Sequence, residues 1–95
     1  IVDGAIAVDR ERRTVHLDGV AIELTPIEFD LYVALLDRRG ADRRRDDLLY
    51  EVWGHRDGSG LRTVDSHVRS IRRKLGDDVV RTVHGVGYAS RDVTP

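Results

Sequence analysis

The stretch LRTVDSHVRSIRRKLGDDVVRTVHGVGY, residues 61–88, decides the fold of this chain. In its first half the apolar residues are three, four, three and four positions apart, at Leu61, Val64, Val68, Ile71 and Leu75. That spacing places them on one narrow stripe of an α-helix, and Gly76 ends the pattern. Further on, residues 79–83 and 88–90 flank a glycine-containing loop, which is typical of a β-hairpin. The stretch therefore predicts a helix followed by a hairpin.

Two more helices are predicted upstream of this stretch. Thr25, Pro26 and Glu28 provide an N-cap hydroxyl, a proline at the first helical position and a reciprocal glutamate, which together form a capping box. Apolar residues then recur at helical spacing until Gly40, so we predict a helix over 26–39. A shorter helix is indicated over residues 46–53, with two aspartates near its N-terminus but a poor N-cap, because an arginine precedes it.

The first two dozen residues predict strands. Short apolar runs occupy residues 5–8, 14–17 and 20–24, and Asp18–Gly19 supplies a hairpin turn between the last two. The aromatic residues of the helical segments fall at positions that also carry apolar core residues, so we expect core packing rather than stacking on nucleic-acid bases for Phe29, Tyr32 and Trp53.

Composition limits the class of protein. A chain of 95 residues supports one core and one domain, residues 1–95. It has no cysteine, so a disulfide framework is excluded, and four scattered histidines give no close-spaced zinc ligand set. The net charge of −1 argues against nucleic acid, but its distribution does not. Residues 61–95 hold seven basic and four acidic residues, whereas residues 1–60 hold nine arginines and thirteen acids.

The basic residues gather on one face of the helix predicted within residues 61–75. At 100° per residue, the side opposite the apolar stripe carries Arg62, Ser66, Arg69 and Arg73, with Ser70 beside them and His67 and Arg72 on the flanks. Arginine forks can bind guanine acceptors or phosphates in the DNA major groove. By itself such a face is more often only a solvated side of an amphipathic helix. The order helix, turn, helix, wing favours DNA binding.

These segments closely resemble the OmpR/PhoB family of winged-helix effector domains, in order and spacing, at LTPIEFDL (24–31), VWG (52–54), RTVDSHV (62–68), RRKL (72–75) and RTVHGVGY (81–88). The resemblance covers residues 8–88. It implies an α+β fold, a winged helix-turn-helix with an N-terminal antiparallel β-sheet, three helices and a C-terminal β-hairpin wing. It also implies sequence-specific binding of double-stranded DNA for transcriptional regulation, as the output domain of a phosphorelay response regulator.

The resemblance further implies which residues bind DNA. The recognition helix, 62–75, would lie in the major groove, and the wing, 79–90, on the adjacent backbone or minor groove. The expected DNA-binding residues are Arg62, Ser66, His67, Arg69, Ser70, Arg72, Arg73, Thr82 and His84, of which Arg62 and Thr82 resemble phosphate anchors. The family commonly has an arginine where this chain has His84, so we expect a weaker wing contact. Residues 41–45 also depart from the family pattern, and we expect a loosely fixed start of the second helix.

The partners and context expected from the family are those of a bacterial, cytoplasmic regulator. We expect a monomer in isolation and a dimer on tandem DNA half-sites, contact with RNA polymerase through the loop 55–60, and no cofactor, metal or membrane. Because the chain opens at Ile1 without methionine, we interpret it as a fragment whose N-terminal portion is missing. Three alternatives remain open for that portion: a phosphoacceptor receiver domain, a membrane-anchored sensor, or no further segment. The resemblance to the family favours the receiver domain.

Two other classes of function remain open. A winged helix can serve as a protein-interaction module without its own DNA specificity, and the acidic N-terminal half could face another domain. An enzyme is disfavoured, because the adjacent acids Asp46–Asp47 and Asp77–Asp78 point in different directions and no nucleophile, base and orienting group converge. Gly85 and Gly87 lack the third glycine and following helix of a dinucleotide-binding loop, and a hairpin turn explains them better.

Overall fold

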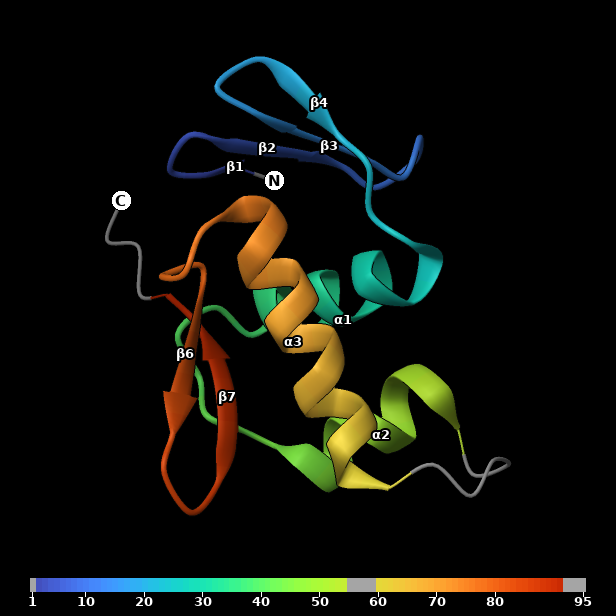
Figure 1. The fold of residues 1–95 in the computed structure, drawn as a ribbon, viewed down its shortest axis with the longest axis vertical. Coiled ribbons are helices and arrows are strands. Elements are labelled where there is room, and N and C mark those ends of the chain that lie inside the picture. Colours follow the sequence, from blue (N-terminus) through green and yellow to red (C-terminus); the bar gives the residue numbers. More distant parts are fainter. Residues whose placement is uncertain (1, 55–59, 92–95) are drawn as a thin grey trace.

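The computed structural model of this chain describes residues 2–54 and 60–91. Three helices occupy the middle of the molecule, a four-stranded sheet covers one end of them, and a second sheet lies along one side (Figure 1). The predicted architecture of an N-terminal antiparallel sheet, three helices and a C-terminal hairpin is confirmed. None of the described helices is long and apolar enough to cross a membrane.

The N-terminal sheet is a meander of four antiparallel strands, β1 (Val2–Asp3), β2 (Ile6–Asp9), β3 (Thr14–Leu17) and β4 (Val20–Ile22), in that order. Asp18 and Gly19 have φ angles of 51° and 81°, the positive values that a tight two-residue hairpin turn requires, so the predicted turn is confirmed. The last strand ends at Ile22, two residues before the predicted end. Strand β1 was not predicted, because two residues are too few to show alternation.

Helix α1 (Pro26–Asp37) begins with the predicted capping box. The Glu28 N–H donates to Thr25 Oγ1 (3.2 Å), and the Thr25 N–H donates to Glu28 Oε1 (2.9 Å). The predicted end at residue 39 is wrong by two residues, because the Arg38 N–H already closes a tighter turn onto the Leu35 carbonyl. Helix α2 (Arg45–Trp53) begins one residue before its prediction, and α3 (Leu61–Leu75) matches the predicted span.

The second sheet contains a strand, β5 (Arg43–Arg44), that the sequence did not predict. Strand β7 (Gly87–Ser90) lies in the middle of this sheet, between β6 (Val80–Val83) and β5. Strands β5 and β7 approach so closely that a β-carbon on Gly87 would lie 2.2 Å from the Arg43 carbonyl oxygen. Arg43 is only 7% exposed and donates to the Ala34 carbonyl (2.9 Å) and to Glu51 (3.1 Å). The expectation of a loosely fixed start of α2 is therefore wrong, although the N-cap residue makes no side-chain capping bond.

One hydrophobic core joins the N-terminal sheet to all three helices. Its fully buried members include Ile6, Leu31, Tyr32, Leu35, Leu48, Val64, Val68 and Ile71. Phe29 and Tyr32 are buried, which confirms their predicted role in the core. The apolar stripe of α3 is buried from Val64 onward, so the opposite side of α3 is directed outward.

Candidate nucleic-acid interface

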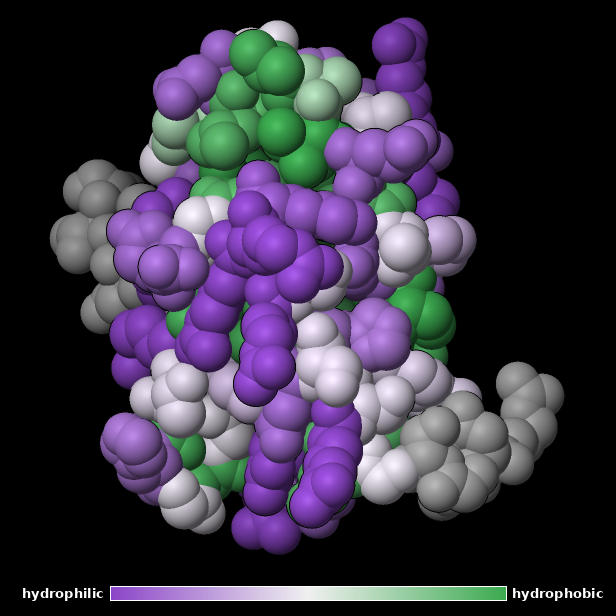
Figure 2. Space-filling view, viewed as in Figure 1, coloured by the Kyte–Doolittle hydropathy of each residue, from purple (hydrophilic) through white to green (hydrophobic). Residues whose placement is uncertain are grey.

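The outward side of α3 is a basic surface. Arg62, Ser66, Arg69 and Arg73 are all exposed there, and we call these four residues the outer face. Figure 2 shows a continuous hydrophilic band over α3 in this view. The side chains of Arg62, Ser66 and Arg69 make no hydrogen bond or ion pair within the described part of the chain, and the Arg73 side chain donates only to Ser70 Oγ (3.2 Å). Unpaired guanidinium groups on a rigid helix are available to bind an anion.

The edge of α3 that faces the second sheet is held to the wing. Arg72 donates to the Val80 carbonyl through Nε (3.1 Å) and Nη2 (2.8 Å), and Nη2 also donates to Thr82 Oγ1 (2.9 Å). The same guanidinium lies 5.7 Å from the centre of the Tyr88 ring. Arg72 therefore fastens α3 to both strands of the hairpin, and the exposed Thr82 hydroxyl keeps its own proton to donate.

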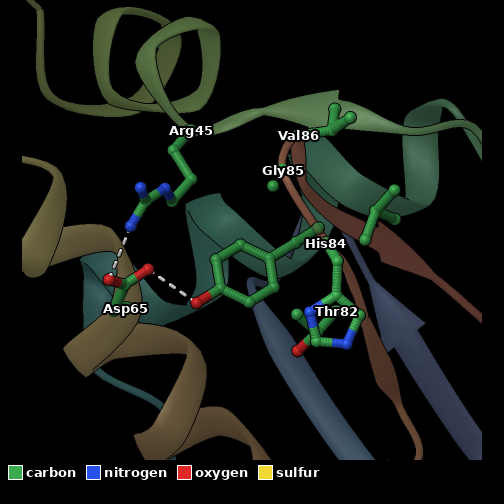
Figure 3. A pocket seen from close by; sticks show the side chains of 9 residues that line it. Arg45, Asp65, Thr82, His84, Gly85 and Val86 are labelled. Carbon is green, nitrogen blue, oxygen red and sulfur yellow. Dashed lines mark hydrogen bonds and ion pairs between the residues drawn. The ribbon is translucent and has the colours of Figure 1, made fainter.

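An open cleft of about 230 Å³ lies between α3 and the wing (Figure 3). Asp65 stands at its edge and accepts from Arg45 Nη1 (2.9 Å) and from the Tyr88 hydroxyl (2.6 Å). Burial and the hydrogen bond to Asp65 raise the pKa of Tyr88 to about 12, so the phenol remains a donor at neutral pH. Thr82 and His84 also line the cleft.

The sequence reasoning missed Arg45, Asp65 and Tyr88. Asp65 is 20 residues from Arg45 and 23 residues from Tyr88 along the chain, so no local pattern joins them. One signal was present, because Asp65 is the one acidic residue among the basic residues of α3. A carboxylate at that position needs a partner.

The opposite edge of α3 faces α1 and α2. His67 is half-buried, its Nδ1 donates to the Thr63 carbonyl (2.7 Å), and its ring meets the edge of Trp53 at 5.1 Å and 73°. The Ser70 hydroxyl donates to Glu28 Oε2. These two predicted DNA-binding residues thus belong to contacts between helices, beside the outer face rather than on it.

Glu28 anchors this edge. It is 4% exposed and accepts hydrogen bonds from Lys74 Nζ (2.7 Å), the Ser70 hydroxyl and the Thr25 N–H (2.9 Å). Burial alone raises the pKa of Glu28, but these hydrogen bonds outweigh it and lower the pKa to about 2. The capping glutamate of α1 therefore stays ionised and fixes α3 against α1.

The tip of the wing carries His84, which is exposed and makes no hydrogen bond with the rest of the described chain. In Figure 1 the hairpin of β6 and β7 runs beside α3. The wing residues Thr82 and His84 therefore lie on the same side of the molecule as α3. Residues 55–59 of the loop predicted to contact RNA polymerase lie outside the described residues.

The adjacent acids do not assemble a catalytic group. Asp46 is exposed and bound by Arg44 (3.1 and 3.2 Å), and this hydrogen bond lowers the pKa of Asp46. Asp78 accepts from Arg91 (3.3 Å), whereas Asp77 points to solvent. Within residues 2–54 and 60–91, no three metal-ligating side chains form a group that could hold a metal ion.

A family model and the sequence relatives all identify transcriptional regulatory proteins. Residues 19–90 match the family model described as transcriptional regulatory protein, C terminal. The chain is 40% identical over 88 residues to the transcriptional regulatory protein VxrB of Vibrio cholerae, covering 93% of this chain and 36% of that protein. It is 42% identical over 90 residues to the DNA-binding response regulator MtrA of Mycolicibacterium smegmatis, covering 90% of this chain and 40% of that protein.

Solved structures agree with the sequence relatives. The DNA-binding domain of RstA from Klebsiella pneumoniae, solved in complex with the RstA box, superposes with a TM-score of 0.85 at 31% identity, covering 96% of this chain and 95% of that chain. The chain spans well under half the length of the VxrB and MtrA proteins. The family consists of transcriptional regulators and not of enzymes. This chain belongs to the family of C-terminal domains of transcriptional regulatory proteins, and within it to the OmpR/PhoB type.

Proposed function

We propose that this domain binds double-stranded DNA in a sequence-specific manner, with α3 in the major groove and the wing on the adjacent backbone or minor groove. The observation that carries the proposal is the outer face of α3, where three exposed arginines stand on a helix whose opposite side is buried in the core. An α-helix fits the major groove, and unpaired arginine forks match phosphates and guanine edges. The similar RstA domain was solved bound to its DNA box.

We divide the nine predicted DNA-binding residues between two proposed roles, according to their exposure and contacts. Direct contact with DNA is proposed for the exposed residues Arg62, Ser66, Arg69, Arg73, Thr82 and His84. A positioning role is proposed for the three half-buried residues that contact other elements. Arg72 is hydrogen-bonded to the wing, Ser70 is hydrogen-bonded to α1, and the ring of His67 packs against Trp53 of α2. Arg72 would have to give up hydrogen bonds to Val80 and Thr82 to reach a base.

We propose that the complete protein is a cytoplasmic phosphorelay response regulator and that this domain is its output part. The family model describes a C-terminal domain, and the chain covers only 36% and 40% of the VxrB and MtrA proteins, which supports a further N-terminal part in the complete chain. We propose that this part is a receiver domain. The family resemblance implies two further interactions. Two copies would bind tandem half-sites on DNA, and the loop 55–60 would contact RNA polymerase.

The test is a fluorescence-anisotropy titration of a duplex selected from a random library, at two or more salt concentrations. Wild type is compared with Arg69→Ala and with Arg12→Ala, a control that removes the same charge from the exposed β2–β3 loop. If Arg69 neutralises one phosphate, Arg69→Ala reduces the slope of log affinity against log salt by about 0.9 in magnitude. Arg12→Ala leaves the slope unchanged.

Two outcomes would overturn the proposal. Equal effects of both substitutions would mean that general charge, and not the outer face, holds the DNA. No binding of any duplex by wild type at low salt would remove DNA from the function, and a protein-interaction module would then be the better hypothesis.

A further inference from the structure

We infer that Asp65 is a specificity-determining positioning residue, which holds the wing at a fixed distance and angle from α3 so that both engage one DNA site. The inference rests on the proposed DNA-binding function and adds a role to a residue that lies outside the predicted interface. Asp65 acts through Arg45 and Tyr88, and not by contact with DNA.

The contacts of Asp65 join three elements. Oδ2 accepts from Arg45, the first residue of α2, and Oδ1 accepts from Tyr88 of β7 (Figure 3). Both hydrogen bonds are short, at 2.9 and 2.6 Å, and Tyr88 is only 8% exposed. Each carboxylate oxygen thus has its own partner on a different element, which restrains rotation as well as distance.

The negative charge of Asp65 cannot serve to attract DNA. Its side chain is 37% exposed on the helix that we propose to face DNA phosphates. A carboxylate there repels DNA, so a neutral residue would favour binding to any duplex. The two hydrogen bonds give a physical reason for the carboxylate, because a neutral side chain cannot accept from both Arg45 and Tyr88 with the same strength.

The wing is also attached to the domain by contacts that do not involve Asp65. Arg72 binds the Val80 carbonyl and the Thr82 hydroxyl and lies over the Tyr88 ring, while β5 pairs with β7 along the other edge. Removal of Asp65 therefore leaves the hairpin attached to the domain. What it removes is the restraint between the N-terminal half of α3 and the Tyr88 hydroxyl, so the wing gains freedom to pivot.

The first measurement compares the affinity for the library-selected duplex with the affinity for a scrambled duplex of the same length. The variants are Asp65→Ala, Tyr88→Phe and the control Asp77→Ala, which removes an exposed carboxylate just after α3 that bonds to no described residue. We expect Asp77→Ala to leave the ratio of the two affinities unchanged. Asp65→Ala should lower the ratio about tenfold, the size of one lost specific contact, because only the selected complex depends on the fixed position of the wing. Loss of the negative charge strengthens binding to both duplexes alike and does not change the ratio. An unchanged ratio for Asp65→Ala overturns the inference.

The second measurement needs no DNA and so separates the inference from the proposed function. The chain has no cysteine, so spin labels on Ser66→Cys and Val86→Cys report the distance between α3 and the wing tip alone. We expect a narrow distance distribution in the labelled parent and with Asp77→Ala, and a broad one with Asp65→Ala and Tyr88→Phe. Tyr88→Phe keeps the ring under Arg72 and serves if Asp65→Ala does not fold, as judged by circular dichroism.

The outcomes are distinguishable. If the wild type selects no duplex but the distributions differ as expected, the DNA-binding proposal fails and the restraint stands. If the distributions of Asp65→Ala and Tyr88→Phe match the parent, the positioning role is wrong, whatever the domain binds.

Discussion

Lys74 and Glu28 form an ion pair of 2.7 Å that joins the last turn of α3 to the first turn of α1. The Glu28 side chain is 5% exposed and that of Lys74 is 29% exposed, so the pair lies at the rim of the core and is only partly screened by water. The same carboxylate caps α1, so one residue fixes both the start of one helix and the angle of the other.

Glu28→Gln should lower the free energy of unfolding at pH 7 by on the order of 2 kcal/mol, because it removes the charge that Lys74 and Ser70 contact in a poorly hydrated site. Urea denaturation followed by circular dichroism measures the loss. Glu23→Gln, at an exposed position of the neighbouring segment, is the matched control and should change stability by less than about 0.5 kcal/mol. Equal losses for the two variants would contradict the role assigned to Glu28.

The stabilisation by Glu28 should depend on pH. Its pKa is about 2 in the folded protein, below the ordinary value of 4.5, so the ionised form contributes stability that is fully present above pH 4.5. That contribution is lost as the pH falls from 4.5 toward 2. The difference in unfolding free energy between wild type and Glu28→Gln should therefore be constant above pH 5 and shrink below it. A difference that stays constant down to pH 2.5 would show that the charge is not responsible.

Gly87→Ala should destabilise the domain by about 2 kcal/mol or more, because the new β-carbon would meet the Arg43 carbonyl at 2.2 Å and the Arg45 nitrogen at 2.9 Å. Backbone atoms cannot rotate away, so β5 must separate from β7. Thermal unfolding measures the effect, and Gly60→Ala is the control, since its β-carbon would meet nothing within 4 Å. Similar melting temperatures for the two variants would mean that the β5–β7 contact is dispensable.

His84→Arg should strengthen DNA binding several-fold and increase the salt slope by about 0.9 in magnitude. The position is exposed at the wing tip, beside the cleft that Asp65 borders, so the longer cationic side chain has room to reach a phosphate or the minor groove. Anisotropy titrations at two or more salt concentrations measure the gain and the slope. No gain in affinity would place the wing tip away from DNA.

The fold was readable wherever a signal was local. The periodic apolar residues of α3 gave its full span, Thr25 and Glu28 marked the start of α1, and the Asp18–Gly19 turn set the register of β3 and β4. The ends of elements were less readable, since the last turn of α1 closes on Leu35 before the glycine that was expected to end it. Strand β5 gave no signal, because two arginines do not resemble a strand until β7 pairs with them.

For the proposed interface, too, some features could be predicted from local sequence and others only from the tertiary structure. The sequence by itself determined which residues share the outer face of α3, because 100° per residue fixes their angular positions once the apolar stripe is known. Only the tertiary structure decided what each edge of that face meets: His67 meets Trp53, Ser70 meets Glu28, and Asp65 meets Arg45 and Tyr88. These partners are far apart along the chain, and they come together through the packing of whole helices and strands, which a repeating local pattern does not encode.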